Sequence, residues 1–418
     1  MPGKVTEVRM WDLPVGYAYW DKEQNCARFQ YDPSFLDKGY DISPVTMPLI
    51  DRQFMFSNLN RESYQGLPGL LSDSLPDRYG NALIDIWLSA NRIPRAEFTP
   101  LDRLCYVGIR GMGALEYRPL QNNRDHDGVI DVDMLSSLAA DVLKHRENIR
   151  ADLSDTGLQS LLSVGTSAGG ARPKAVVGLN ESTGDIRSGQ LDLPEGYTYW
   201  IIKFDTEKED KRGYCRIEYA YHEMAKACGI EMNECRLLDT GSRAHFMTKR
   251  FDRTEQGKEH MQTLCALAHY DFMVPGKHSY EETVGVMRKM HIDHGDVEQM
   301  FRRLVFNVIM MNRDDHTKNF SFLMDRNGKW RLSPAYDITY AFSPDNYWIS
   351  KHQMSVNGKL DGIGRNDLKE FAHYARIRDP DDIIDLTLSV ASEWKGYAKL
   401  SGVPDRTTDA INEVLLKI

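Results

Sequence analysis

Short apolar runs separated by turn residues dominate the first part of the chain. Up to about residue 120, Gly, Pro and Asp interrupt runs that are rich in β-branched and aromatic residues, a pattern typical of strands. The stretch from Asn81 to Ala90 instead has apolar residues at helical spacing. The pattern therefore predicts a small β-rich module with one embedded helix. Its strands are expected at residues 17–20, 27–31 and 105–109.

Helical and strand patterns alternate in the middle of the chain, and helical patterns dominate its end. Residues 121–128 are polar, hold no apolar anchor and are predicted to form a linker. Beyond about residue 256 the pattern is mainly helical. In between, we expect helices at 132–164 and 217–228, and strands at 175–179, 199–204 and 245–250.

This order predicts an α+β protein with two main lobes, the first β-rich and the second mainly helical. A chain of 418 residues with 41% hydrophobic content exceeds the size at which a single core usually splits into domains. We expect an N-terminal β-rich subdomain at 1–120, a lobe with a glycine-rich loop at 129–255, and a helical lobe at 256–418.

Charge and cysteine usage exclude several classes of function. The formal net charge of −9 gives no overall electrostatic reason to bind DNA or an anionic membrane, so DNA binding by this chain alone is not expected. The six cysteines form no CxxC pair, which argues against a zinc cluster or a disulfide framework. The chain has no apolar signal segment at its start and no apolar run of about eighteen residues. A soluble, unprocessed protein of the cytosol is expected.

A glycine-rich loop covers residues 165–174 and ends in Lys174. Its three glycines would let backbone N–H groups approach a phosphate where side chains would obstruct it. The loop is not a Walker A motif, because no Gly-Lys-Ser or Gly-Lys-Thr follows. Taken alone, a glycine-rich surface turn is the better explanation of the loop. Its position before a strand that carries a lysine favours phosphate binding.

That strand is the apolar run at residues 199–204, which contains Lys203. Burying an ammonium group without a partner is costly, so the lysine needs an explanation. One explanation is contact with the α- and β-phosphates of a nucleotide, and another is a structural ion pair or a side chain that reaches solvent. Glu218 and Glu223, on the following predicted helix, are both candidate partners.

The polar segment 312–319 and the segment 336–338 carry the strongest chemical signal. Phosphoryl transfer to a hydroxyl uses one carboxylate to orient the attacking group, an Asn five residues later and a further Asp to hold metal ions. Asp314, Asn319 and Asp337 have that order and spacing. The sequence therefore predicts kinase chemistry, with a kinase-like fold of two lobes.

Simpler explanations exist for the same segment. An Asp-rich turn often caps the preceding helix, and Asn319 at the required offset is what argues against this here. His316 would either orient a neighbouring group or serve a structural role. Lys318 would either balance phosphate charge or lie in solvent. Asp315 adds a carboxylate that would either change the number of bound metal ions or face outward.

With these motifs, the chain resembles the HipA family of bacterial serine/threonine kinases, the toxins of HipA–HipB toxin–antitoxin systems. The resemblance runs over most of the chain. The family's N-terminal subdomain is similar to residues 13–31, 73–77 and 107–115. Its glycine-containing loop, nucleotide-binding strand and adenine-bordering strand are similar to 167–174, 201–203 and 249–253. Its catalytic and metal-binding segments are similar to 314–319 and 336–338.

The resemblance implies roles for individual residues. Asp314 is expected to be the catalytic base, with His316 in the catalytic group, and Asn319 and Asp337 are expected to bind Mg²⁺. ATP is expected to contact Lys203, Ser167, Gly169, Gly170, Lys174, Lys249, Phe251 and Lys318.

The resemblance also implies regulation and partners. Ser167 is expected to be autophosphorylated, which would expel the loop from the ATP site, although Ser163 and Thr166 are neighbouring acceptors. The expected partner is a HipB-like helix-turn-helix antitoxin, through which DNA would be reached indirectly, with no membrane contact. Family substrates include aminoacyl-tRNA synthetases. Two alternatives stay open: a small-molecule or lipid phosphotransferase, and a non-catalytic module that binds an antitoxin on DNA.

Overall fold

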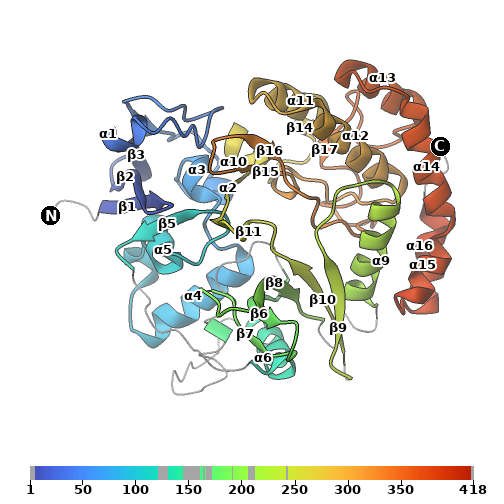
Figure 1. Cartoon of the computed structure of the whole chain (residues 1–418), viewed down its shortest axis with the longest axis horizontal. Helices are drawn as coiled ribbons and strands as arrows, with labels where there is room; N and C mark the ends of the chain where they lie inside the picture. The colour runs from blue at the N-terminus through green and yellow to red at the C-terminus, as the bar shows by residue number, and fades with distance from the viewer. Residues whose placement is uncertain are drawn as a thin grey trace. The chain divides into compact units, whose positions relative to one another are not determined.

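The structure is a computed structural model that describes residues 5–120, 130–144, 161–162, 165, 172–190, 192–205, 212–241 and 243–415. Contacts between residues divide the chain into two compact units. Unit 1 comprises residues 1–43, 47–206 and 238–261, and unit 2 comprises residues 44–46, 207–237 and 262–418. Large β-sheets lie in the N-terminal part and helices dominate toward the C-terminus, which confirms the predicted α+β class (Figure 1).

Unit 1 begins with a five-stranded antiparallel sheet in the order β4-β3-β2-β1-β5 (Figure 1). Alternating burial along β1 and β3 places one face of this sheet against a core, as the strand pattern predicts. Its strands are β1 (Val5–Met10), β2 (Leu13–Asp21), β3 (Cys26–Tyr31), β4 (Gln53–Met55) and β5 (Leu115–Arg118). The helices in this part are α1 (Pro33–Leu36), α2 (Arg61–Tyr64), α3 (Gly69–Ser72), α4 (Arg78–Ala90), the 3₁₀ turn η1 (Arg95–Glu97) and α5 (Pro100–Val107).

One predicted strand is wrong. The run Cys105 to Ile109 is not a strand, because its first residues form the end of helix α5. The helix begins at a capping box, in which Thr99 and Asp102 satisfy each other's backbone N–H groups, with Pro100 at the first helical position. A short apolar run cannot be assigned from composition alone, and the capping signal upstream decides it here.

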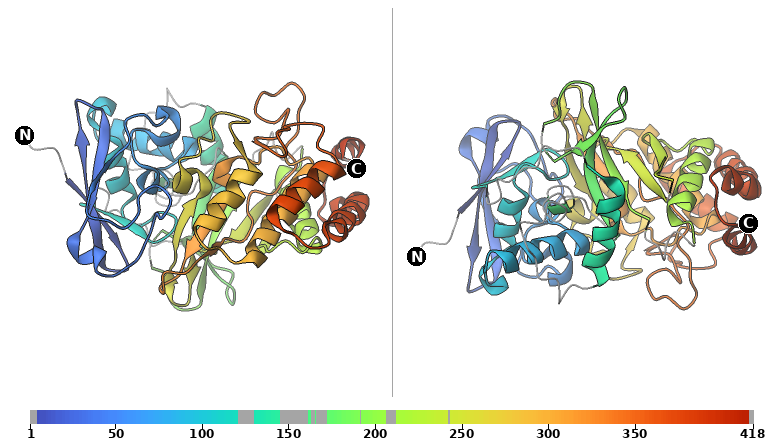
Figure 2. Two further views of the ribbon diagram at one scale, coloured as in Figure 1. Left: turned by 90° about the horizontal axis from the view of Figure 1, so that it is seen from above. Right: turned by 90° about the horizontal axis from the view of Figure 1, so that it is seen from below.

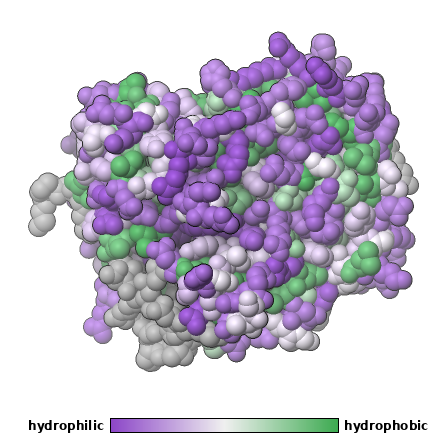
Figure 3. Space-filling view, in the orientation of Figure 1, coloured by the Kyte–Doolittle hydropathy of each residue, from purple (hydrophilic) through white to green (hydrophobic). Residues whose placement is uncertain are grey.

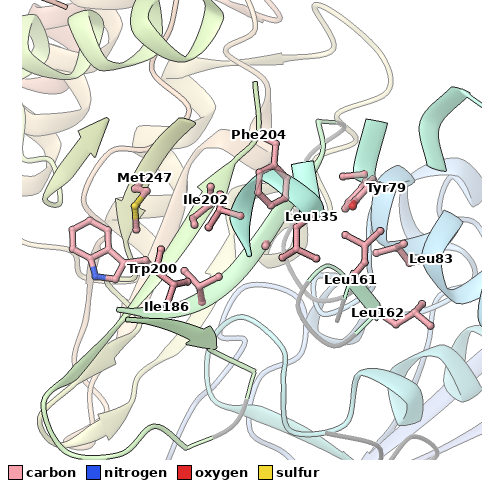
Figure 4. Packing of buried hydrophobic residues seen from close by; sticks show 14 of the residues in the cluster. Tyr79, Leu83, Leu135, Leu161, Leu162, Ile186, Trp200, Ile202, Phe204 and Met247 are labelled. Carbon is pink, nitrogen blue, oxygen red and sulfur yellow. The ribbon is translucent and has the colours of Figure 1, made fainter. Parts of the chain in front are cut away.

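The second sheet of unit 1 has the order β7-β6-β8-β10-β9. Residues of β8 alternate between its two faces, so that Trp200 and Ile202 enter a core together with Met247 of β10. In Figure 4 this core continues from these side chains through Leu135 toward Tyr79, which come from helices outside the sheet. The elements here are α6 (Val132–Lys144), β6 (Lys174–Asn180), β7 (Ile186–Ser188), β8 (Tyr197–Lys203), β9 (Cys235–Asp239) and β10 (Ala244–Lys249).

A buried ion cluster joins the end of β10 to the N-terminal module within unit 1. Asp252 accepts hydrogen bonds from Arg250 Nη2 at 2.7 Å, from Arg253 Nη1 at 2.8 Å and from the backbone N–H of Gly113 at 2.6 Å. Both arginines also donate to the carbonyl of Gly111. Burial alone would raise the pKa of Asp252, but the two guanidinium groups hold it below its usual range. The cluster fixes residues 111–113 against the second sheet. The short hairpin of β11 (Arg253–Thr254) and β12 (Gly257–Lys258) follows it.

Unit 2 is mainly helical, with small sheets at its centre. Tyr221 of α9 packs edge-to-face on Phe306 and Trp394, which brings α9, α12 and α15 together. The helices are α9 (Tyr214–Ala227), α10 (Leu264–Ala268), α11 (Tyr280–Lys289), α12 (His294–Ile309), the 3₁₀ turn η2 (Thr317–Asn319), α13 (Arg365–Ala375), α14 (Pro380–Ser392), α15 (Trp394–Leu400) and α16 (Asp405–Val414). The last two lie side by side in both views of Figure 2. The short strands are β13 (His260–Thr263), β14 (His278–Ser279), β15 (Ser321–Met324), β16 (Trp330–Leu332) and β17 (Met354–Ser355).

Neither the hydropathy of the surface nor the helices of the described residues indicate a membrane-spanning helix. On the face shown in Figure 3, hydrophilic residues predominate and hydrophobic ones occur in small groups. Within the described ranges, no helix combines the length and the apolar character needed to cross a bilayer. None of the six cysteines forms a disulfide.

His260 is expected to make unit 1 sensitive to acid. Its side chain is fully buried, its Nε2 lies 2.9 Å from the carbonyl of Ile42, and burial lowers its pKa to about 4. Because the unfolded chain binds a proton near pH 6.5, stability should fall as pH drops from about 6.5 to 4, by roughly 1–2 kcal/mol at pH 5. Urea unfolding against pH would measure the slope. His260→Gln should reduce the dependence of the free energy of unfolding on pH by the equivalent of up to one bound proton. His373→Gln, at an exposed position, should leave this dependence unchanged.

Candidate functional site

Two lysines lie directly opposite each other at one end of the second sheet. Lys174, the first residue of β6, pairs in register with Lys203, the last residue of β8. Because Trp200 and Ile202 face the core, Lys203 lies on the other face of the sheet. Phe246 of β10 is its other neighbour, and Lys203 Nζ lies 5.7 Å from the centre of that ring. Two lysines on neighbouring strands make this face of the sheet positively charged, which suits phosphate groups.

Of the other residues predicted to bind ATP, some lie away from the face that carries Lys203, and some fall outside the described residues. Lys249 pairs with Trp200, so it lies on the core-facing side of the sheet. Lys203 lies on the other side. Phe251 follows β10 and is half-buried. Ser167, Gly169 and Gly170, together with the alternative acceptors Ser163 and Thr166, fall outside the described ranges.

Gly165 has a packing role. A Cβ built at this position would lie 2.6 Å from a methyl group of Leu83 and 3.3 Å from the ring of Tyr79. Close packing against α4 therefore favours glycine at this position, a reason that is independent of phosphate binding.

In unit 2, the predicted catalytic segment follows directly from helix α12. The helix ends at Ile309, the carbonyl of Met310 accepts a hydrogen bond from Tyr221, and Met311 adopts a left-handed conformation with φ 55°. Asn312 then forms a parallel bridge with Ala341, which holds the start of the loop. The sharp change of direction turns the next residues out of the helix axis.

Within this loop, Asp314 and Asn319 are directly connected. Asn319 Nδ2 donates to the carbonyl of Asp314 at 2.7 Å, and the backbone N–H of Asn319 donates to the carbonyl of His316. With its amide nitrogen used in this way, the amide oxygen of Asn319 is the atom left for a cation. The Asp314 side chain is 49% exposed, and its Oδ1 lies 3.9 Å from His316 Nε2. Asp314 can thus reach a substrate hydroxyl while His316 stands beside it.

Asp337 belongs to a segment tied to the same loop. The hydroxyl of Tyr336 donates to the carbonyl of Lys318 at 2.7 Å and also contacts Ser321. Asp337 has a left-handed backbone with φ 52°, a conformation that Asp tolerates better than most residues. The structure therefore brings the Asp337 segment beside the residue that precedes Asn319.

These donors fit magnesium. Mg²⁺ is usually bound through one or two carboxylates together with substrate phosphates and water, and it prefers hard oxygen ligands. Asn319 and Asp337 offer an amide oxygen and a carboxylate from joined segments. Across the residues that the structure describes, no group of three or more His, Cys, Asp or Glu side chains is placed to hold a metal, so a zinc-like cage is not found there.

Phe272 packs against the cationic side of the loop. Lys318 Nζ lies 4.7 Å from the centre of the Phe272 ring, and the His316 ring lies 5.6 Å from it. Thr317 Oγ1 donates to the carbonyl of Tyr270 at 2.7 Å, so residues 270–272 are bonded to the loop. An aromatic face restrains a lysine and leaves its N–H donors available, so Lys318 suits contact with a phosphate.

Asp315 has a role that neither sequence alternative anticipated. It is buried and accepts hydrogen bonds from Tyr280 Oη at 2.8 Å, from His352 Nδ1 at 2.9 Å and from the backbone N–H of Gln353 at 2.7 Å. Burial, and then the charge of Asp315, raises the pKa of Tyr280, which stays a neutral donor. Asp315 therefore holds the loop in place through three buried hydrogen bonds, and its side chain does not face outward. Nothing in its local sequence indicates this.

The two glutamates considered as partners of Lys203 differ in environment. Glu218 of α9 is buried, whereas Glu223 is part-exposed and lies 3.5 Å from Lys226 and 3.4 Å from His222. Burial lowers the pKa of His222 to about 4. The Glu223 carboxylate thus already interacts with side chains of its own helix. The pairing of Lys203 stays a prediction.

Phosphoryl transfer requires oxygen donors for a metal, lysines for phosphates and a carboxylate for the acceptor hydroxyl.

Comparison with family models identifies the family of this chain. Residues 6–118 match the family model "HipA N-terminal domain" and residues 166–395 match "HipA-like C-terminal domain". Because these matches cover most of its length, the chain belongs to the HipA family.

Individual relatives extend this comparison. The Sinorhizobium fredii protein "Putative kinase Y4dM" is 28% identical over 217 residues, 47% of this chain and 51% of the relative. A Haemophilus influenzae "Putative kinase" is 28% identical over 135 residues, 29% of this chain and 39% of the relative. The chain thus spans about half or less of the curated relatives it matches.

A solved structure shares the fold. The complex of the Shewanella oneidensis MR-1 toxin–antitoxin system HipA, HipB and its operator DNA contains a chain that aligns with a TM-score of 0.65. The alignment covers 98% of this chain and 96% of that chain at 16% sequence identity. At this identity the likeness concerns the fold.

Proposed function

We propose that this protein is an ATP- and Mg²⁺-dependent serine/threonine protein kinase that acts as a HipA-like toxin. The observation that carries the proposal is the joining of two segments in unit 2: Asn319 bonds to the carbonyl of Asp314, and Tyr336 bonds to the carbonyl of Lys318. These bonds hold a carboxylate for the acceptor and oxygen donors for a metal on adjacent backbone. Family membership and relatives named as kinases support the proposal.

In the proposed reaction, Asp314 accepts a hydrogen bond from the acceptor hydroxyl and takes its proton as the oxygen attacks the γ-phosphorus. The bond between the γ-phosphorus and the bridging oxygen breaks, and ADP leaves. Bound Mg²⁺, held by Asn319 and Asp337, would neutralise charge on the phosphates. Lys174 and Lys203 would contact phosphate oxygens, and Lys318 would add positive charge. Positioning and charge neutralisation supply the catalysis, so no covalent enzyme intermediate is required.

The proposal extends to partners. The similar fold in a HipA, HipB and operator DNA complex supports a HipB-like antitoxin as the partner of this chain. Because the net charge is −9, DNA would be reached through that antitoxin. The acceptor would be a protein in the cytoplasm. An aminoacyl-tRNA synthetase is one candidate that the family suggests.

Autophosphorylation gives a direct test. Purified protein incubated with radiolabelled ATP and Mg²⁺ should incorporate phosphate, and mass spectrometry should place it on Ser167. Phosphoserine carries about −1.5 to −2 charge, so the modified protein should bind ATP more weakly, by about tenfold or more.

Two variants make the test specific. Asp314→Ala should incorporate no phosphate and keep its affinity for ATP, whereas Asp409→Ala, which removes only an exposed ion pair with Lys395, should behave like wild type. Incorporation by Asp314→Ala at the wild-type rate would contradict the assignment of the base. Phosphate found only on Ser163 or Thr166 would contradict the assignment of the acceptor.

A further inference from the structure

The segment after Asp337 is held by the residue that precedes Asp314. Arg313 Nη2 donates to Asp361 Oδ1 at 2.7 Å, and Nη1 donates to the carbonyl of Ser350. The guanidinium carbon also lies 4.6 Å from the centre of the Phe342 ring. Arg313 is almost fully buried, and a guanidinium fixed by a carboxylate, a carbonyl and a ring has little freedom.

The same segment is held by the residue that follows Asp314. Asp315 accepts hydrogen bonds from His352 and from the backbone N–H of Gln353, both buried. Residues 342–361 are therefore clamped on both sides of Asp314, through its two neighbours in the chain. A displacement of this segment would disturb Arg313 or Asp315, so its position relative to Asp314 is fixed.

Between the clamped points, residues 343–350 form an ordered turn. The backbone N–H of Ser350 donates to the carbonyl of Asn346 at 2.8 Å, and the N–H of Trp348 donates to Asn346 Oδ1 at 2.9 Å. Gln353 Nε2 donates to the carbonyl of Trp348. The turn thus has internal bonds and a bond to Gln353, whose own backbone N–H is bonded to Asp315.

This turn exposes two large aromatic side chains. Tyr347 is 71% exposed and Trp348 is 40% exposed, and their rings pack edge-to-face with centres 5.2 Å apart. Trp and Tyr supply much of the binding energy at protein interfaces, because each offers a large rigid surface at a small entropic cost. An ordered turn that presents both to solvent is a typical contact surface.

We propose that Tyr347 and Trp348 form the docking contact for the acceptor polypeptide, against which an apolar side chain of the substrate packs. The proposal rests on the proposed kinase function and adds the surface by which its polypeptide acceptor is recognised. The clamp through Arg313 and Asp315 gives the contact a fixed place relative to Asp314. Because the two rings are exposed to solvent, they suit an extended chain that also reaches Asp314, and they would contribute nothing to a small acceptor bound at Asp314 alone.

A degenerate peptide library tests this. Each peptide carries one Ser or Thr acceptor, with one other position fixed and the rest mixed, and phosphorylation is measured with radiolabelled ATP. Wild type should select an aromatic or aliphatic residue at one position. The double variant Tyr347→Ala, Trp348→Ala should lose that selection, and its KM for the best peptide should rise about tenfold or more. Its KM for ATP and its peptide-free ATP hydrolysis should not change.

The double variant Tyr17→Ala, Tyr19→Ala is the matched control, since it removes two exposed aromatics from β2 of unit 1 and should keep wild-type selection. Equal selection by wild type and by the Tyr347, Trp348 variant would overturn the docking contact and leave the kinase function standing. Transfer by wild type to small acceptors alone would also overturn it.

Two further outcomes bear on the proposal. Absence of any ATP turnover or transfer in wild type would overturn the kinase function and the docking contact with it. Sedimentation of wild type and of the Tyr347, Trp348 variant tests whether the turn instead binds a second copy of this chain. A wild-type dimer that the double variant cannot form would assign the turn to this contact and overturn the proposal. A wild type and variant of equal mass support it.

Discussion

Asp337→Ala is expected to lower the rate of Mg²⁺-dependent phosphoryl transfer by about a thousandfold. The carboxylate is the only charged metal donor assigned in the proposed site, so its loss removes charge compensation where the phosphates must be held. Asn319→Ala should have a comparable effect, because it removes the amide oxygen and also the bond to the Asp314 carbonyl. Transfer of labelled phosphate from ATP, at a Mg²⁺ concentration that saturates wild type, measures both rates.

The fold should survive these substitutions. Asp337 is part-exposed, but Ala tolerates its left-handed φ of 52° less well than Asp does, so Asp337→Ala should lower the free energy of unfolding by about 1 kcal/mol. Circular dichroism should match wild type, and thermal unfolding should shift only slightly. Raising the Mg²⁺ concentration should restore part of the activity of Asn319→Ala, which retains the carboxylate. A wild-type rate in either variant would rule out these metal roles.

Asp315→Ala is expected to lower the free energy of unfolding by about 3–5 kcal/mol. The substitution leaves Tyr280, His352 and the Gln353 N–H buried without their acceptor. Because the same bonds hold the segment next to Asp314, the variant should also lose activity. Denaturant unfolding followed by tryptophan fluorescence measures the stability change.

Two comparisons isolate the cause. Asp315→Asn keeps the volume and one oxygen acceptor, so it should lose less stability than Asp315→Ala. Asp293→Ala, which removes an exposed ion pair with Lys329, should change stability by less than about 1 kcal/mol. A stability loss for Asp315→Ala no larger than that of Asp293→Ala would show that the three bonds do not brace the loop.

Local sequence was sufficient to predict the elements that carry the candidate site. Periodicity located α4, α9, β6, β8 and β10 to within a few residues, because their apolar residues repeat with the period of the element. It failed at Cys105 to Ile109, where a short apolar run fits a strand and a helix equally well and the capping box of Thr99 and Asp102 decides. Gly165 was interpreted as part of a phosphate loop, whereas the described structure shows a packing reason for it.

The spacing of Asp314, Asn319 and Asp337 was visible in the sequence because the first two lie on one short loop. That spacing predicts the chemistry but not the contacts. Only the tertiary structure joins Tyr336 to Lys318, places Lys174 opposite Lys203, and puts Lys249 on the other face of the sheet. Strand register is set by pairing between segments distant in the chain, which a local pattern does not encode.

By itself, therefore, the sequence determined the α+β class, the main helices and strands, and the residue types on which phosphoryl transfer would depend. The tertiary structure alone decided what each polar residue contacts. Asp314 and Asp315 are chemically identical neighbours, yet one is exposed at the loop and the other is buried beneath it with three donors. The physical reason is that burial and hydrogen-bond partners come from Tyr280, His352 and Gln353, which the chain brings together only when it folds.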